Sequence, residues 1–242
     1  METYRKDKNA PEKARDNKRR EFLKKGVLCG TLASVTGLSS VSGCKEEAAE
    51  DISPAEDLMR EHGILNRILL IYDACKLHLI NEEKFPADVL HNSAMIIRDF
   101  IEGYHEKLEE DFLFPRFLKL LYLPDLIQIL SIQHSAGRDI TGQIIQMTRA
   151  SALTDSDENR KLIKLLNDFN TMYRPHEARE DTVLFPAIRK IIPKKEYFAL
   201  GEHFERKEHE LFGEDGFEAM VEKVSTLEKQ LGIYDLSEFT PQ

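Results

Sequence analysis

A histidine- and glutamate-rich segment occurs twice in this 242-residue chain. The two copies begin at His105 and His176 and align without gaps as HExxE[ED]xxLFP. In an α-helix, residues i and i+4 lie on the same face, so the pattern places His105 beside Glu109 and His176 beside Glu180. Each copy therefore predicts an imidazole and a carboxylate that point in the same direction.

One further histidine precedes each copy by a similar distance. His62 lies 43 residues before His105, and His134 lies 42 residues before His176. Each half of the repeat is thus predicted to be a helical hairpin, with a lone histidine on its first helix and a His/Glu pair on its second. The six residues predicted to converge are His62, His105, Glu109, His134, His176 and Glu180. Imidazole and carboxylate ligands suit iron, manganese or zinc, and two carboxylates from facing helices can bridge two metal ions.

The alternative explanation of the repeat is a duplicated packing motif. A packing motif accounts for the repeated Leu-Phe-Pro but not for ionisable residues at core positions. Burying Glu or His there costs several kcal/mol of folding free energy unless the side chain is paired or metal-bound. We therefore favour a site for two metal ions. Glu106 and Glu177 each follow a predicted ligand and could join the site, although we expect them to be solvated or to support the ligands.

The other histidines and one cysteine are predicted to lie outside the site: His78, His91, His203, His209 and Cys75. His91 would lie about 21 Å along the helix from His105. His78 would be rotated by about 160° from His62. The two histidines of the charged segment 202–210 are expected on a solvated face, and the cysteine is expected to be a small core residue.

Helical signals surround these residues. Ser53-Pro54-Ala55-Glu56 combines a capping box with a proline at the first helical position. Helices are predicted from Ser53 to about Asn81, from Pro86 to the region of Pro115, from Leu123 to near Ser151, and after the polar break 154–158, followed by a helical tail from Pro193 to Leu231. Four long helices with short connections predict an all-α, up-down four-helix bundle over residues 53–190, with an additional C-terminal helical segment over 191–242.

The charge is distributed unevenly along the chain. Residues 1–25 hold 10 Lys and Arg and 5 Asp and Glu, and residues 26–43 hold no charged residue. From Cys44 onward there are 24 Lys and Arg against 38 Asp and Glu, so this part should repel phosphate backbones, which argues against nucleic acid as a partner. Three scattered cysteines cannot form a disulfide framework.

The N-terminal segment resembles a bacterial export signal. Residues 19–24, Arg-Arg-Glu-Phe-Leu-Lys, resemble the twin-arginine pattern RRxFLK, and the uncharged run after them ends in Val-Ser-Gly-Cys, which resembles a lipobox. The resemblance implies a signal peptide over 1–43, lipidation at Cys44 and a short tether over 44–52. The protein would then be an exported, membrane-anchored lipoprotein on the periplasmic or extracytoplasmic side. A plain N-terminal helix with a chance arginine pair is the alternative.

Residues 53–190 resemble the hemerythrin-like family, also called the HHE cation-binding domain. The repeated HExxE…LFP motif and Gln133-His134-Ser135-Ala136-Gly137-Arg138 carry this resemblance. It implies a non-haem di-iron centre, with two irons per chain, that binds oxygen or a related diatomic such as nitric oxide. By match to the motif, the six converging residues would be ligands, with Glu109 and Glu180 bridging the irons. Oxygen-carrying hemerythrins use five histidines, whereas only four are well placed here, which leaves positions for water, oxygen or another side chain.

Three classes of function remain open. The leading one is binding or sensing of oxygen or nitric oxide. The second is a di-iron oxidoreductase that oxidises iron or reduces nitric oxide or peroxide; against a ferritin-like site, Glu102-x-x-His105 is the only Glu-x-x-His motif that reaches the site, with Tyr173 at the counterpart of Glu102. The third is iron storage or signalling. Iron–sulphur repair is less favoured, because related repair proteins carry an added cysteine-bearing N-terminal domain. The sequence identifies no redox partner.

Overall fold

The first helix begins where its capping box predicts. In the computed structural model, which describes residues 53–149 and 156–241, the Glu56 N–H donates to Ser53 Oγ (3.3 Å) and the Ser53 N–H donates to the Glu56 carboxylate (3.1 Å). Helix α2 (Pro54–Ile80) follows and ends at Asn81, as predicted. The predicted signal peptide, Cys44, the tether through residue 52 and the predicted helix end at Ser151 lie outside the described residues.

The second long helix alternates α-helical with π-helical turns. Its consecutive parts are α3 (Ala87–Ile96), η2 (Ile97–His105), α4 (Glu106–Leu108), η3 (Glu109–Leu113) and α5 (Phe114–Lys119). The helix continues past the predicted end at Pro115, because that proline lies in the first turn of α5 after a π-helical segment, where its missing N–H costs little.

The third and fourth long helices complete the two hairpins. They are α6 (Pro124–Thr148) and the run α7 (Ser156–Arg179), η4 (Glu180–Leu184) and α8 (Phe185–Ile191). In both copies of the repeat a π-helical segment begins at the second glutamate, Glu109 or Glu180. π-Helical turns are rare and occur frequently at functional sites.

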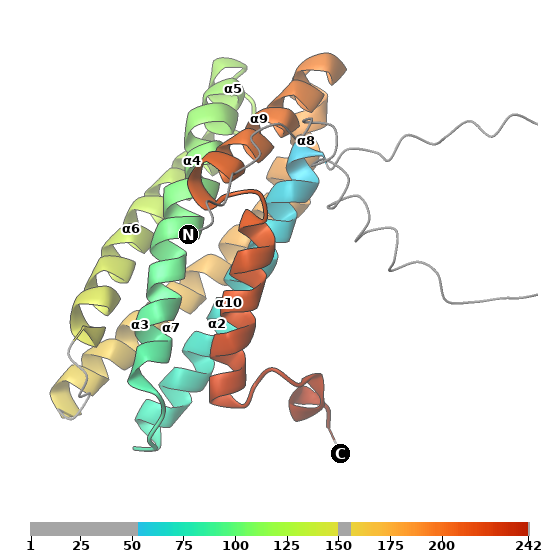
Figure 1. Ribbon diagram of the computed structural model, residues 1–242. Coiled ribbons are helices and arrows are strands. Elements are labelled where there is room, and N and C mark those ends of the chain that lie inside the picture. Colours follow the sequence, from blue (N-terminus) through green and yellow to red (C-terminus); the bar gives the residue numbers. More distant parts are fainter. Residues whose placement is uncertain (1–52, 150–155, 242) are drawn as a thin grey trace, which may run out of the picture. The chain divides into compact units, whose positions relative to one another are not determined.

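The four long helices pack around one core. α2 contacts α7, α6 contacts both α3 and α7, and η2 contacts α2 and α6 (Figure 1). The core holds large side chains that are fully buried, among them Tyr72, Phe100, Leu130 and Phe169. The predicted all-α four-helix bundle is therefore confirmed, and the described residues contain no β-strand. Of the helices seen in these residues, none is long and apolar enough to cross a membrane.

The C-terminal segment folds back onto the bundle. It consists of α9 (Lys194–Phe212), α10 (Gly216–Leu231) and the short η5 (Leu236–Phe239). The predicted single tail is broken at Gly213, whose φ of +87° favours glycine and ends α9. Both α9 and α10 contact α2, and Arg67 Nε donates to Glu228 Oε1 at 2.9 Å. The tail thus packs against the bundle, as predicted.

One expectation about this tail was wrong. His203 does not lie on a solvated face: its ring is half-buried against Phe112, with ring centroids 4.6 Å apart, and burial lowers its pKa. The nearby Glu208 is fully buried and accepts a hydrogen bond from the Phe217 N–H at 2.9 Å. Because α9 folds back, side chains that look polar and solvated in the sequence become part of an interface. His209 is exposed, as predicted.

Candidate metal centre

The bundle core brings together all six of the residues singled out by the repeat. They are His62, His105, Glu109, His134, His176 and Glu180, and none of them is more than 4% exposed. The four imidazoles form two pairs from different helices. The ring centroids are 4.7 Å apart for His62 and His105 and 5.0 Å apart for His134 and His176. Each pair offers two nitrogens to one position in the core.

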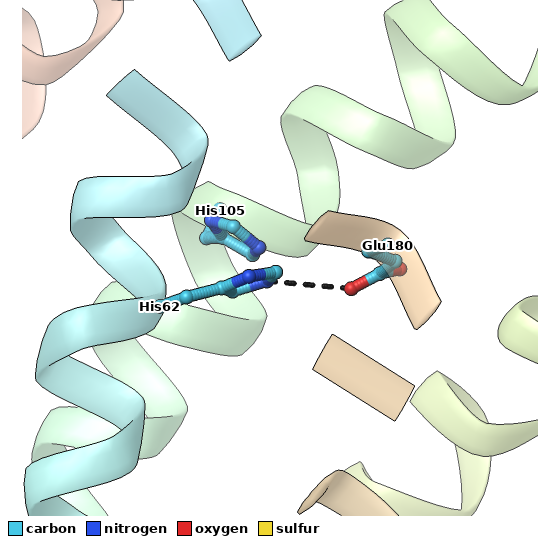
Figure 2. Close-up of side chains that lie close together, drawn as sticks. All are labelled: His62, His105 and Glu180. Atoms are coloured by element: carbon cyan, nitrogen blue, oxygen red, sulfur yellow. Dashed lines mark ion pairs between the residues drawn. The ribbon is translucent and has the colours of Figure 1, made fainter. Parts of the chain in front are cut away.

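The two glutamates connect these pairs. Glu180 lies 3.3 Å from His62 Nε2 and 3.2 Å from His176 Nε2, and Figure 2 shows it facing His62 and His105. Glu109 lies 3.4 Å from His134 Nε2 and 3.9 Å from His105 Nε2. Each carboxylate thus lies between one histidine of each pair. This is the arrangement in which two carboxylates could each join two metal positions.

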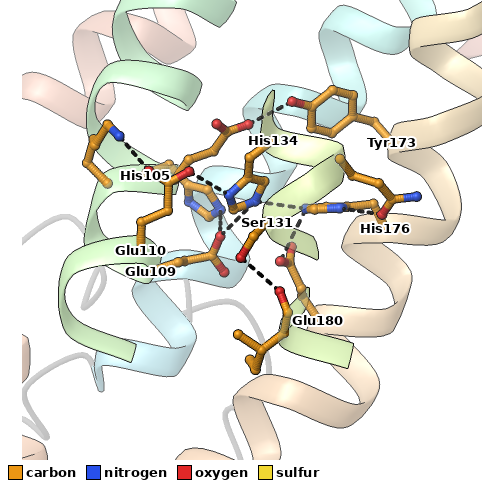
Figure 3. Close-up of polar contacts among 12 residues, drawn as sticks. His105, Glu109, Glu110, Ser131, His134, Tyr173, His176 and Glu180 are labelled. Carbon is orange, nitrogen blue, oxygen red and sulfur yellow. Dashed lines mark hydrogen bonds and ion pairs between the residues drawn. The ribbon is translucent and has the colours of Figure 1, made fainter. Parts of the chain in front are cut away.

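The lone histidine of each half is held by an acidic residue of the other half. His62 Nδ1 is 2.7 Å from Asp181 Oδ1, and His134 Nδ1 is 3.1 Å from Glu110 Oε1 (Figure 3 shows the second contact). An acceptor at Nδ1 favours the proton there, which leaves the Nε2 lone pair free to face the site. Asp181 and Glu110 are equivalent positions of the repeat, each directly after the bridging glutamate.

The histidines of the repeat itself are held in the same way from within their own half. His105 Nδ1 is 2.8 Å from Glu61 Oε2, and His176 Nδ1 is 2.9 Å from Gln133 Oε1. Glu61 and Gln133 each precede a lone histidine. The sequence analysis assigned no role to these four acceptors. Glu110 and Asp181 occupy the [ED] position of the motif, and aligning the halves beyond it would have shown Glu61 and Gln133 at matching positions.

The phenylalanine of each Leu-Phe-Pro stacks on the lone histidine of the other half. Phe114 lies against His134, with ring centroids 5.5 Å apart and planes 19° apart, and Phe185 lies against His62 at 5.3 Å and 26°. The apolar part of the repeat therefore fixes the two imidazoles from the side while the acidic part fixes them through Nδ1. Packing and site formation use the same motif.

Glu106 and Glu177 are both buried, so of the two predicted alternatives, a solvated or a supporting position, the structure has the supporting one. Glu106 accepts hydrogen bonds from Tyr173 Oη (2.7 Å) and Arg138 Nη1 (2.6 Å), and Glu177 accepts one from Asn66 Nδ2 (2.7 Å). Burial raises the pKa of Glu106 to about 8 and that of Glu177 to about 7. Their carboxylates are engaged by these donors, which gives them a supporting place around the six central side chains.

The four carboxylate oxygens of Glu109 and Glu180 have no hydrogen-bond partner among the described residues, although both side chains are fully buried. Imidazole Nε2 atoms lie 3.2–3.9 Å from these carboxylates, and a buried carboxylate that is incompletely paired costs several kcal/mol. Two metal ions would supply the missing partners, and the set of four imidazole nitrogens and two carboxylates fits iron, manganese or zinc. The residues present therefore fit a dimetal centre.

The electrostatics of the metal-free site are strongly asymmetric. Burial and the neighbouring Glu180 raise the pKa of Glu109, whereas Glu180, despite its burial, is held well below its ordinary pKa by His176 and His62. Burial alone would lower the pKa of His62, but Asp181 and Glu180 outweigh it and raise the pKa to about 10. The raised pKa values of Glu109 and His62 favour their protonated forms, so metal binding there would compete with protons.

The other candidates lie outside the site, as predicted. His91 Nδ1 contacts Thr148 Oγ1 at 3.0 Å, and His78 Nδ1 contacts Glu83 at 3.0 Å. Cys75 is a buried free cysteine of the core, and burial raises the pKa of its thiol to about 12.

Comparison with known proteins identifies the family to which this bundle belongs. Residues 53–188 match the profile of the family described as the hemerythrin HHE cation binding domain. The uncharacterized protein Rv1995 of Mycobacterium tuberculosis (strain ATCC 25618 / H37Rv) and the uncharacterized protein Mb2018 of Mycobacterium bovis are each 43% identical over 225 residues, which covers 88% of this chain and 88% of the relative. No solved structure matches the chain.

Proposed function

Since the chain belongs to the hemerythrin HHE cation-binding domain family, we propose that it holds two iron ions in the bundle core. One ion would be held by His62 and His105 and the other by His134 and His176, with Glu109 and Glu180 shared between them. The observation that carries this proposal is the set of buried carboxylate oxygens without hydrogen-bond partners. Iron in such a set supplies one-electron redox chemistry and a coordination position for a small ligand.

The proposed ligand is oxygen or a related diatomic such as nitric oxide. The six central side chains are at most 4% exposed, so a bulky substrate could not reach the donor atoms. Phe114 and Phe185 cover two of the imidazoles and keep water away from them. Enclosure of this kind favours binding or sensing of a small uncharged molecule over chemistry on a large one.

A di-iron oxidoreductase is the second candidate, and one observation favours it. Tyr173 donates to Glu106, Arg138 donates to both Glu106 (2.6 Å) and Glu110 (2.7 Å), and Glu110 contacts His134 Nδ1. The Glu110 side chain is 18% exposed, so the path from His134 reaches solvent through this carboxylate, while the guanidinium of Arg138, which stays protonated, holds Glu106 and Glu110 in place. Such a path could move protons during turnover.

Metal analysis and optical spectra of the purified protein test these proposals. We expect two irons per chain. In the reduced protein, oxygen should produce an absorption band that persists and disappears when oxygen is removed. Rapid conversion to a featureless oxidised form, with continued oxygen consumption, would favour the oxidoreductase instead. One tightly held zinc, or no metal after growth in iron-replete cells, would refute the di-iron site.

The protein is also proposed to be exported through the twin-arginine route and lipidated at Cys44. Support comes from the order of the two signals, because the arginine pair at 19–20 precedes an uncharged run that ends in Val-Ser-Gly-Cys. Export of a folded chain would suit a protein whose metal is loaded before it leaves the cytoplasm.

A further inference from the structure

An exposed apolar loop projects from the end of the bundle where α5 turns into α6. It contains Leu118, Leu120, Leu121 and Tyr122, which are 46%, 56%, 81% and 38% exposed, and we refer to these four residues as the apolar tip. The backbone of Leu121 has a φ of +51° and that of Leu123 a φ of +54°, a conformation that side chains other than glycine adopt rarely. Exposed leucines in a strained turn point to a binding role.

The apolar surface continues from the tip onto the side of the bundle. Leu118 and the first half of α6 line a shallow groove of about 530 Å³. Its apolar residues are Leu118, Pro124, Ile127 and Ile132, and its polar residues are Asp125, Gln128, Ser131 and Ser135. Ile132 is 56% exposed. The tip therefore borders a groove to which apolar and polar side chains both contribute.

Basic residues are concentrated in two segments at this end of the bundle, in a protein that is acidic overall. Segments 114–125 and 185–198 contain six Lys and Arg and only two Asp and Glu, whereas the whole chain has 34 against 43. The six are Arg116, Lys119, Arg189, Lys190, Lys194 and Lys195. The two segments meet, because Arg116 Nη2 pairs with Glu196 at 3.0 Å and so joins α5 to the start of α9.

The chain also enters the bundle at this end. Helix α2 contacts α8, and Glu56 in the first turn of α2 interacts electrostatically with Arg189 of α8. Residues 44–52 precede this point, and nine residues can span at most about 30 Å. A lipid on Cys44 would therefore hold this end of the bundle, and not the opposite one, close to a bilayer.

We propose that the apolar tip docks on the membrane surface. Leu120 and Leu121 would insert among the headgroups of a bilayer that contains anionic lipids, and the surrounding Lys and Arg side chains would face the lipid phosphates. The inference rests on the proposed lipid anchor, and it adds a contact made by the folded domain that fixes which end of the bundle faces the bilayer. One lipid signal combined with a basic, apolar surface attaches a protein more firmly than either alone.

Vesicle sedimentation with the full-length Cys44→Ala chain tests the docking without the anchor. The test variant adds Leu120→Glu and Leu121→Glu. The matched control adds Leu77→Glu and Ile80→Glu, which introduce the same charge at side chains 56% and 54% exposed near the other end of α2. With vesicles of phosphatidylglycerol and phosphatidylcholine, we expect the affinity of the tip variant to fall by at least roughly tenfold. The affinity of the control should stay within about twofold of the parent. Circular dichroism and iron content verify that both variants fold.

Equal binding by the parent and the tip variant would overturn the proposal. So would an equal loss in the tip variant and the control, which would reflect added charge alone. If the tip variant changes the molar mass measured by analytical ultracentrifugation while vesicle binding stays constant, the tip forms a contact between copies of the chain. That result would also overturn the proposal. Failure of the anchor is separate, because it appears as an unlipidated N-terminus in the mass of the cellular protein.

Discussion

Tyr173 occupies the space that a side chain at Gly137 would need. A Cβ atom built on Gly137 would lie 2.0 Å from Tyr173 Oη, and the same hydroxyl donates to Glu106 at 2.7 Å. The close approach of α6 and α7 beside the candidate metal centre therefore depends on the absence of one methyl group. Gly142, on the same helix, has no atom within 4 Å of such a Cβ position.

Gly137→Ala should displace Tyr173 and destabilise the protein by roughly 1–3 kcal/mol, because α6 and α7 cannot both keep their positions. Gly142→Ala is the matched control and should raise stability by up to about 1 kcal/mol, since alanine restricts the unfolded chain and favours helix. Urea unfolding measures both. Equal midpoints for the two variants would show that the contact does not constrain the helices.

His176→Ala should lower both iron content and thermal stability, because metal that binds only the folded chain stabilises it in proportion to its affinity. His62→Ala and His134→Ala should behave alike if the two halves are equivalent. The exposed His209 provides the control, whose replacement by alanine should change stability by no more than about 0.5 kcal/mol. Loss of iron in the His209 variant, with wild-type iron in the His62 or His134 variant, would refute the ligand set.

Asp181→Ala should weaken metal binding roughly 10–100-fold, because it removes the acceptor that orients His62 through Nδ1. Glu110→Ala should do the same through His134. Asp111 is exposed and follows Glu110 directly, so Asp111→Ala serves as the control. Competition with a chelator followed by metal analysis measures the affinities. Wild-type affinity in the Asp181 and Glu110 variants would show that the imidazoles are oriented by packing alone.

Asp73 should make stability depend on pH. Its partial burial would raise its pKa, but Arg174, Lys76 and Asn170 outweigh that effect and lower it. A lowered pKa in the folded state means that the unfolded chain binds more protons, so this contribution is complete above the unfolded pKa of about 3.9 and is lost as pH falls through the folded pKa. The free energy of unfolding of the wild type should exceed that of Asp73→Asn by about 1 kcal/mol near pH 6, and this difference should shrink below about pH 4. A difference that is constant over this range in urea titrations would contradict the assignment.

Replacing Arg19 and Arg20 with lysine should leave the protein in the cytoplasm, whereas Cys44→Ala should release it from the membrane or leave its precursor unprocessed. Cell fractionation and the mass of the mature protein measure both effects. An unchanged mature, membrane-bound form in both variants would refute the proposed signal.

The helical periodicity of the sequence predicted the bundle because apolar and capping residues act locally. The spacing of the repeat likewise brought His105 and Glu109 onto one face. The π-helical segments that begin at Glu109 and Glu180 were not predicted, since the extra residue in the turn is accommodated by tertiary packing and has no distinct residue type. The contact of His203 with Phe112 was missed for a similar reason, because it forms only when α9 folds back after Gly213.

The exchange of supports between the two hairpins bears on when the protein can acquire its metal. Asp181 orients His62 and Glu110 orients His134, so each half supplies what the other lacks. A nascent chain that ends before Glu180 would present the first hairpin with His62 lacking its Nδ1 acceptor and without the second of the two proposed bridging carboxylates. In the proposed dimetal centre, metal binding would therefore require synthesis of both hairpins, and a truncated product would lack a complete binding site.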